Sequence, residues 1–153
     1  MASLTDEEID RCIEASAVAR LATVDGDGNP HVVPIVFAIH AGRLWSPVDG
    51  KAKRSTRLAR LANVAVHPRV SVLIDRYDDD WRSLWWVRID GDARVVTDAD
   101  LAGEEFSAVE AALREKYPQY RDVPLFSGVP TLLCIAPRAR RIWRASDASP
   151  LRV

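Results

Sequence analysis

The sequence has few cysteines, and its two thiols are far apart. Cys12 and Cys134 are the only cysteines among 153 residues, and each lies in an apolar stretch. There is no CxxC motif and no Cys/His spacing of a zinc site, and a disulfide framework is not expected from two distant thiols. We therefore interpret both as buried structural thiols, and we expect no metal site.

Long apolar runs and a strong net charge are also missing. No segment reaches the roughly 18 apolar residues of a membrane-spanning helix, and the first eight residues are acidic rather than basic, unlike a secretion signal. The formal net charge of −1 argues against a dedicated nucleic-acid-binding protein, which usually carries a wide basic face. These features predict a cytoplasmic protein with neither a membrane nor a nucleic acid as its partner.

The signature motifs of several enzyme classes are absent. No GxGxxG joins a strand to a helix, and no GxxxxGK[ST] occurs, so the dinucleotide and P-loop fingerprints are lacking. His31, His40 and His67 have no nucleophile pattern around them, and neither a Ser-His-Asp nor a Cys-His arrangement is visible. The sequence therefore identifies no catalytic residue.

The composition that remains suits one folded domain. Hydrophobic residues make up 48% of the chain and charged residues 28%, as in an ordinary globular protein. A chain of this length buries about two-thirds of its unfolded surface. Since we find no repeat and no low-complexity tract, residues 1–153 are predicted to form a single domain.

Hydrophobic periodicity predicts three helices. Thr5-Asp6-Glu7-Glu8 has the form of a capping box, which would start a short helix ending near Ser16. Apolar residues at helical spacing predict a second helix from about Ser55 to Pro68. The same spacing predicts a third helix from Ala102 to Tyr117.

Alternation of apolar and polar residues predicts six strands. Pro34 lies within the second strand and is expected to mark an edge or a bulge, and Gly91 is expected to mark a bend or bulge that curls the sheet. Because hairpins link most of the strands, we predict a mainly β (α+β) fold, a six-stranded antiparallel split β-barrel of the FMN-binding-protein type with peripheral helices. The expected strands are 18–24, 31–39, 44–48, 70–74, 85–95, and a last strand over 131–135 and 141–143 that is interrupted or kinked at Pro137.

Positive charge is concentrated where the second helix begins. Five cations and no acid lie between Lys51 and Arg60. A helix N-terminus already carries about half a positive charge and unpaired N–H groups, so these cations are unfavourable there unless an anion lies among them. With two neighbouring hydroxyls they form a phosphate cradle, and the alternative is a solvated basic helix face. The cradle residues are Lys51, Lys53, Arg54, Ser55, Thr56 and Arg57.

Several segments together resemble a known family. Segments 19–24 and 30–37, the run Lys51-Ala-Lys53 followed by 67–71, and segment 86–93 resemble the split-barrel flavin-binding superfamily that contains pyridoxamine 5′-phosphate oxidase. The runs Arg60-Leu61-Ala62-Asn63 and Ile142-Trp143 are similar to its branch that uses the deazaflavin coenzyme F420. The resemblance extends from about Thr5 to Ala145 and depends on the order of short motifs.

This resemblance implies a homodimer with two cofactor sites at the subunit interface. It implies that the cofactor phosphate lies on the cradle, with Lys53 and then Lys51 as the strongest matches. It also implies that two strand segments line the flat cofactor ring through backbone groups, with barrel core as the alternative. These segments are Pro34, Ile35 and Val36, and Ser46, Pro47 and Val48.

Two residues of the longest strand are assigned to the outward face. Trp85 and Trp86 point to opposite faces, and Arg88 shares the face of Trp86. In the family such outward faces meet the dimer partner, so Trp86 and Arg88 are expected at the interface or over the neighbour's cofactor. Surface or core packing is the alternative.

The function that the resemblance implies is hydride transfer from reduced F420 to a small electron-poor organic substrate. The alternatives are an FMN-dependent oxidase or reductase of the same fold, a non-catalytic protein that stores or delivers the coenzyme, and an interaction domain without a cofactor. The surplus of cations favours F420, because the terminal phosphate of FMN is short. The longer C-terminal segment of pyridoxamine-phosphate oxidases, with its substrate-binding arginines, is not found, so vitamin B6 chemistry is not expected.

Overall fold

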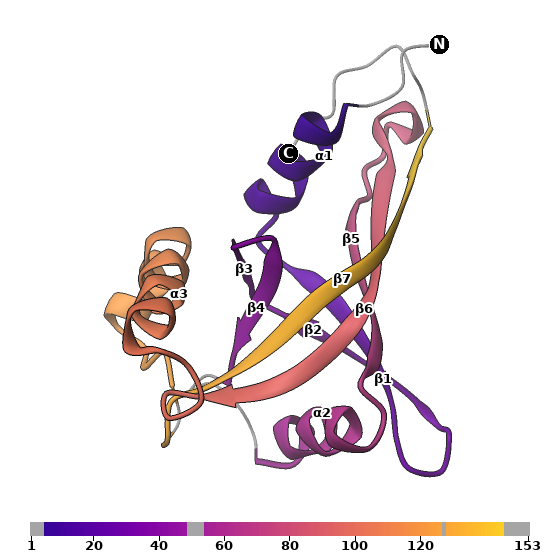
Figure 1. Cartoon of the computed structure of the whole chain (residues 1–153). Coiled ribbons are helices and arrows are strands. Elements are labelled where there is room, and N and C mark those ends of the chain that lie inside the picture. The colour runs from indigo at the N-terminus through magenta and orange to yellow at the C-terminus, as the bar shows by residue number, and fades with distance from the viewer. Residues whose placement is uncertain (1–4, 49–53, 127, 146–153) are drawn as a thin grey trace.

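The computed structural model describes residues 5–48, 54–126 and 128–145 of the chain (Figure 1). It contains three α-helices, α1 (Asp6–Ala15), α2 (Arg54–Val66) and α3 (Gly103–Lys116), and two short 3-10 helices, η1 (Trp81–Ser83) and η2 (Pro118–Arg121). The predicted capping box is confirmed. The Thr5 hydroxyl accepts from the Glu8 N–H at 3.3 Å, and the Glu8 carboxylate accepts from the Thr5 N–H at 3.0 Å.

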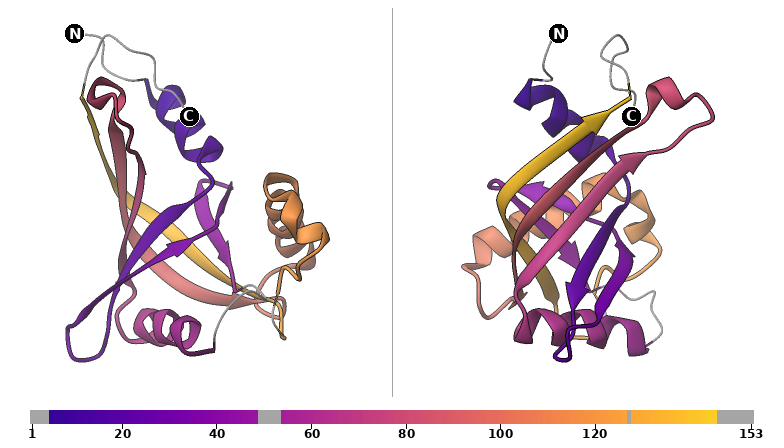
Figure 2. Two further views of the ribbon diagram at one scale, coloured as in Figure 1. Left: turned by 180° about the vertical axis from the view of Figure 1, so that it is seen from behind. Right: turned by 90° about the vertical axis from the view of Figure 1, so that its right-hand side faces the viewer.

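The described strands form one antiparallel sheet. Its order is β2-β1-β5-β6-β7-β4-β3, so the two edge strands, β2 and β3, are consecutive in the chain. The sheet is open and strongly twisted, which agrees with the predicted split barrel (Figures 1 and 2). The strands are β1 (Ala19–Val24), β2 (Pro30–Ile35), β3 (Ala38–His40), β4 (Arg43–Pro47), β5 (Arg69–Arg76), β6 (Trp85–Thr97) and β7 (Thr131–Arg144).

The number of strands differs from the prediction, because the expected strand 31–39 divides into β2 and β3. At Phe37 the backbone leaves the ladder. Its N–H donates to the Tyr117 hydroxyl at 3.0 Å, and the same hydroxyl lies 2.9 Å from the Phe37 carbonyl oxygen. β2 is an edge strand, as expected from Pro34. The strand continues through Pro34, because a proline at an edge removes no hydrogen bond from a neighbouring strand.

The last strand was predicted to be interrupted or kinked at Pro137, but β7 runs through it as one strand. The irregularity is a β-bulge. Gly91 faces Pro137 and Asp90 faces Ala139, so Arg138 is the extra residue. The predicted bend or bulge at Gly91 is confirmed as a bulge. The glycine is required there, since an added Cβ would lie 2.5 Å from the Ala136 carbonyl oxygen.

The apolar core has two parts. The larger lies on the inner face of the curled sheet, with α1 at one end and α2 at the other (Figures 1 and 2). The smaller lies between α3 and the strands β3, β4 and β7, and Trp45 is its largest fully buried side chain. None of the described helices combines the length and the apolarity needed to span a membrane.

Candidate cofactor site

The end of β4 is joined to helix α2. Arg60 donates from Nη2 to the carbonyl oxygen of Pro47 at 3.4 Å, and the N–H of Val48 donates to the carbonyl oxygen of Thr131 at 3.0 Å. Pro47 and Val48 are therefore held between α2 and the beginning of β7. Three of the predicted site residues, 46–48, thus lie at the same corner of the molecule as the helix that was predicted to bind phosphate.

Helix α2 begins at Arg54, one residue before the predicted start, and its first turn contains no acidic residue. The first four N–H groups of a helix have no partner within it, so the start of α2 has the donors and the dipole that an anion requires. Lys51 and Lys53 lie outside the described residues, as do the side chains of Arg54, Ser55, Thr56 and Arg57. Their contact with a phosphate therefore stays a prediction.

Ser46 carries a buried hydroxyl without a hydrogen-bond partner among the described residues. The residue is 1% exposed, and its Oγ has no acceptor or donor within reach. Buried polar side chains without a partner are rare. An oxygen of a cofactor bound at this corner would supply the missing partner, so the donor set here fits a polar, anionic ligand.

The second predicted strand segment lies beside the first. Because Ala38 pairs with Trp45 in an antiparallel ladder, the chain immediately before Ala38 runs toward the end of β4. Pro34 is exposed, Val36 is half-buried, and the Ile35 side chain belongs to the core. Ile35 can therefore contact a ligand only through its backbone, as predicted for this segment, and the contact itself stays a prediction.

Trp86 and Arg88 lie elsewhere, on the outer face of β6. Trp85 is 2% exposed and faces the core, which confirms the predicted orientation of the two tryptophans. Trp86 and Arg88 line a cleft of about 280 Å³ together with Leu73, Asp75 and Tyr77.

Strand register separates Arg88 from the other predicted segments. Pro34 faces Arg20, Arg20 faces Leu73, and Leu73 faces Arg88. At about 4.8 Å between neighbouring strands, Pro34 and Arg88 lie about 14 Å apart on one face. Within one chain, two strands therefore lie between Pro34 and Arg88, and their contact with one cofactor stays a prediction.

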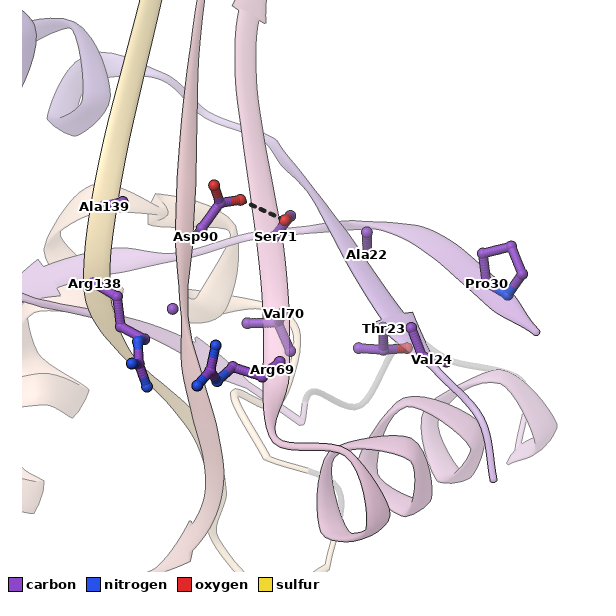
Figure 3. A pocket seen from close by; sticks show the side chains of 11 residues that line it. Ala22, Thr23, Val24, Pro30, Arg69, Val70, Ser71, Asp90, Arg138 and Ala139 are labelled. Atoms are coloured by element: carbon purple, nitrogen blue, oxygen red, sulfur yellow. Dashed lines mark hydrogen bonds between the residues drawn. The ribbon is translucent and has the colours of Figure 1, made fainter. Parts of the chain in front are cut away.

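A second cleft on this outer face was not predicted from the sequence. It has a volume of about 400 Å³, and Arg69 and Arg138 reach it from β5 and β7 (Figure 3). In the same cleft the Ser71 hydroxyl donates to Asp90 at 2.6 Å, and this bond, with the nearby Arg88 guanidinium, holds the pKa of the Asp90 carboxyl below its usual value. Residues 69 and 138 are distant in sequence, so only the strand register brings them together.

The remaining candidates for reactive chemistry have buried reactive atoms. Cys12 and Cys134 are free and buried, as predicted, and burial raises the pKa of both thiols. The Nδ1 atom of His31 is buried without a hydrogen-bond partner in the described structure. Across residues 5–48, 54–126 and 128–145, no group of three or more His, Cys, Asp and Glu side chains could hold a metal ion.

The fold and the sequence can be placed among known proteins. The family model of pyridoxamine 5′-phosphate oxidase matches residues 5–143. The chain belongs to this family. Members of the pyridoxamine 5′-phosphate oxidase family share a flavin-binding split barrel, so a flavin or a related cofactor is the ligand class that this fold binds.

Solved structures share this fold at low sequence identity. The conserved hypothetical protein Rv2991 of Mycobacterium tuberculosis has a TM-score of 0.73 and 23% identity over 94% of this chain and 86% of its own. HutZ, the heme storage protein of Vibrio cholerae, has a TM-score of 0.69 and 20% identity over 91% and 93%. An F420 reductase has a TM-score of 0.57 and 21% identity over 86% of this chain and 94% of its own. None of the curated proteins compared with the chain matches it.

Proposed function

We propose that the chain is an F420-dependent oxidoreductase that transfers a hydride to a small electron-poor organic substrate. One observation carries the proposal. Helix α2 of this family member opens without an acid in its first turn, and it is bound through Arg60 to the end of β4, where the Ser46 hydroxyl has no partner in the described structure. A helix start with unpaired N–H groups, on a helix that is joined to the end of β4, suits the phosphate end of a cofactor.

The number of cations favours F420 over FMN. Lys51, Lys53, Arg54 and Arg57 bring four positive charges to the start of α2, whereas a short terminal phosphate needs fewer. The phosphodiester and acidic tail of F420 would use the additional cations through charge-assisted hydrogen bonds. FMN, with oxidase or reductase chemistry on the same fold, is the alternative.

The protein's role in the reaction is to bind and orient. When bound, the deazaflavin supplies the hydride. The residues at the start of α2 would hold the phosphate, and the backbone groups of 34–36 and 46–48 would bind the ring. The buried side chains of Ile35 and Ser46 keep water from the inner side of that corner. We assign no general acid or base, and solvent delivers the proton to the product.

We also propose that the functional unit is a homodimer. Trp86 and Arg88 lie on the outer face, away from the α2 corner of their own chain. Trp86 is paired with Trp143, which is 43% exposed, and the neighbouring Leu73 is 37% exposed. A second copy covering this apolar patch would place Trp86 and Arg88 over the partner's cofactor, which explains why the two halves of the predicted site are separate within one chain.

Parallel titrations with F420 and FMN test the proposed function. We expect F420 fluorescence to change on binding with a lower Kd than that of FMN, and reduced F420 to be oxidised in the presence of enone, imine or quinone acceptors. Lys53→Ala should weaken F420 binding by about 1–3 kcal/mol, because a charge-assisted contact is lost. Arg11→Ala, an exposed change on α1, is the matched control and should leave the affinity unchanged.

Any other result of these titrations supports a different function. Tighter binding of FMN establishes the FMN alternative, and tight F420 binding without oxidation by any acceptor indicates storage or delivery. Hemin serves as a comparison ligand in the same titration. If neither F420 nor FMN binds, the oxidoreductase proposal is wrong. Sedimentation velocity tests the dimer separately, and a monomer at micromolar concentration would contradict it.

A further inference from the structure

Two guanidinium groups from strands on either side of β6 meet at one carboxylate. Arg69 Nε lies 3.0 Å from Asp92 Oδ1, and Arg138 Nη1 lies 2.9 Å from Asp92 Oδ2. Each carboxylate oxygen therefore binds a different guanidinium, and Asp92 holds the two side by side. Both arginines remain largely accessible, with side chains 71% and 52% exposed.

The β-bulge accounts for the position of Arg138. In a regular strand, alternate residues point to opposite faces, and Ala139 already faces Asp90 on the outer side. Because Arg138 is the extra residue of the bulge, its side chain escapes this alternation and reaches the outer face beside Asp92. Bulges commonly redirect a side chain in this way, and Gly91 permits this one since a Cβ would meet the Ala136 carbonyl oxygen.

Arg69, Arg138 and Asp92 form a cluster with a net charge of one positive unit. Arg69 and Arg138 share the single charge of Asp92, and each keeps guanidinium donors that this ion pair does not use. Asp90, the carboxylate that lines the cleft, is already bound to Arg88 at 3.1 Å and to Ser71 at 2.6 Å. Asp90 therefore does not neutralise the Arg69–Arg138 pair.

The cleft above this pair is mainly apolar. Figure 3 shows Arg69 and Arg138 close together at one side, with Asp90 and Ser71 beyond them. The volume of about 400 Å³ is within the range of small-molecule sites. Small apolar side chains make up most of the remaining wall: Ala22, Val24, Pro30, Val70 and Ala139.

We propose that this cleft binds an organic carboxylate with a flat apolar body, its carboxylate on Arg69 and Arg138. Two adjacent guanidinium groups offer parallel donors that match the two carboxylate oxygens, and the apolar wall receives the body. A monoanion fits better than a phosphate dianion, because the spare charge is a single one and the ionised Asp90 lies on the opposite side. None of the residues that line the cleft belongs to the predicted coenzyme segments 34–36, 46–48 and 51–57, and the proposal does not rest on the proposed function.

Fluorescence titration with 2-naphthoate, without any coenzyme, tests this inference. We expect 1:1 binding at least tenfold tighter than that of the neutral 2-naphthamide, and no tighter binding of 2-naphthyl phosphate. Arg69→Gln and Arg138→Gln should each weaken naphthoate binding at least tenfold. Arg82→Gln is the matched control, since Arg82 is also an exposed arginine paired with an aspartate, Asp80, but lies outside the cleft.

Three results would overturn the proposal. One is equal affinity for the naphthoate and the amide. Another is naphthoate binding unchanged in both glutamine variants while their circular dichroism stays native. The third is that the variants sediment as monomers, the wild type sediments as a dimer, and naphthoate affinity is unchanged. That result would show that Arg69, Arg138 and Asp92 form an ion network at the subunit interface. F420 affinity, measured in the same variants and expected to be unchanged, separates this inference from the proposed coenzyme site.

Discussion

The hydroxyl of Tyr117 accepts a hydrogen bond from the backbone N–H of Phe37, with N and O 3.0 Å apart. The same hydroxyl lies 2.9 Å from the carbonyl oxygens of Phe37 and Ala17, and its one proton can be donated to either. Tyr117 thus links the end of α3 to the break between β2 and β3 and to Ala17, two residues before β1.

Removing this hydroxyl should destabilise the fold. Tyr117→Phe leaves a buried N–H without a partner, which costs about 1–3 kcal/mol, and we expect the free energy of unfolding to fall by that amount in urea titrations. Tyr77→Phe is the control, because Tyr77 is 75% exposed. An unchanged unfolding midpoint for Tyr117→Phe would show that water replaces the hydroxyl.

A methyl group at Gly91 should disrupt the bulge. The Cβ of Gly91→Ala would lie 2.5 Å from the Ala136 carbonyl oxygen, a backbone atom that cannot rotate away. Overpacking of this kind costs about 1–3 kcal/mol, measurable as a lower thermal or urea midpoint. Gly26→Ala, where an added Cβ meets nothing within 4 Å, should have a much smaller effect. Equal effects of the two changes would contradict the bulge geometry.

Lys116 should make stability depend on pH in the alkaline range. Burial lowers the pKa of Lys116 to about 8, against the opposing charge of Glu14, from an ordinary value of 10.5. The unfolded chain therefore binds more protons than the folded chain between pH 8 and 10.5, and the contribution of Lys116 to stability rises with pH across that window. Its ammonium lies 3.7 Å from the centroid of the Phe37 ring, which partly offsets the cost of burial.

The variant Lys116→Met removes this titration. We expect the unfolding free energy of the variant minus that of the wild type to fall as pH rises from 8 to 10, because only the wild type gains stability when Lys116 is deprotonated. The other ionisable groups titrate alike in both proteins. Urea unfolding at pH 7, 8, 9 and 10 measures it. A difference that is constant over this range would show that the folded-state pKa of Lys116 is not lowered.

The contact between Asn63 and Thr23 should show energetic coupling. The Asn63 side-chain amide donates to the Thr23 hydroxyl at 3.0 Å, and both residues are buried. Thr23→Val should cost about 1–3 kcal/mol, because it leaves the amide unpaired. The double change with Asn63→Leu should cost less than the sum of the two single changes in a double-mutant cycle. Simple additivity would mean that this bond does not hold α2 to β1.

The sequence predicts elements whose pattern is local. The capping box at Thr5, the start of α2 and the opposite faces of Trp85 and Trp86 were all predicted, because each depends on residues within a few positions of one another. The break at Phe37 was not predicted, because its cause is a hydroxyl 80 residues later in the chain. Pro137 was expected to interrupt a strand, but the bulge lets the strand pass a residue without an N–H.

The candidate site likewise contains some residues that the sequence predicted and others that it could not predict. Residues 34–36 and 46–48 were predicted from segment resemblance, and strand pairing does bring these segments together. The joining of Arg69 and Arg138 at Asp92 depends on two strand registers and a bulge, none of which a single sequence specifies. The separation of Arg88 from Pro34 likewise follows from sheet order.

The order of the strands has a consequence for synthesis of the protein. The β3–β4 hairpin joins the rest of the sheet through β7 alone among the described strands, and β7 ends at Arg144. Until β7 has been synthesised, that hairpin has no strand of the main sheet to pair with among the described strands, and the edges of β4 and β6 stay open to other chains. Completion of the sheet must wait for β7, so we expect the nascent polypeptide to depend on chaperones until Arg144 has left the ribosome.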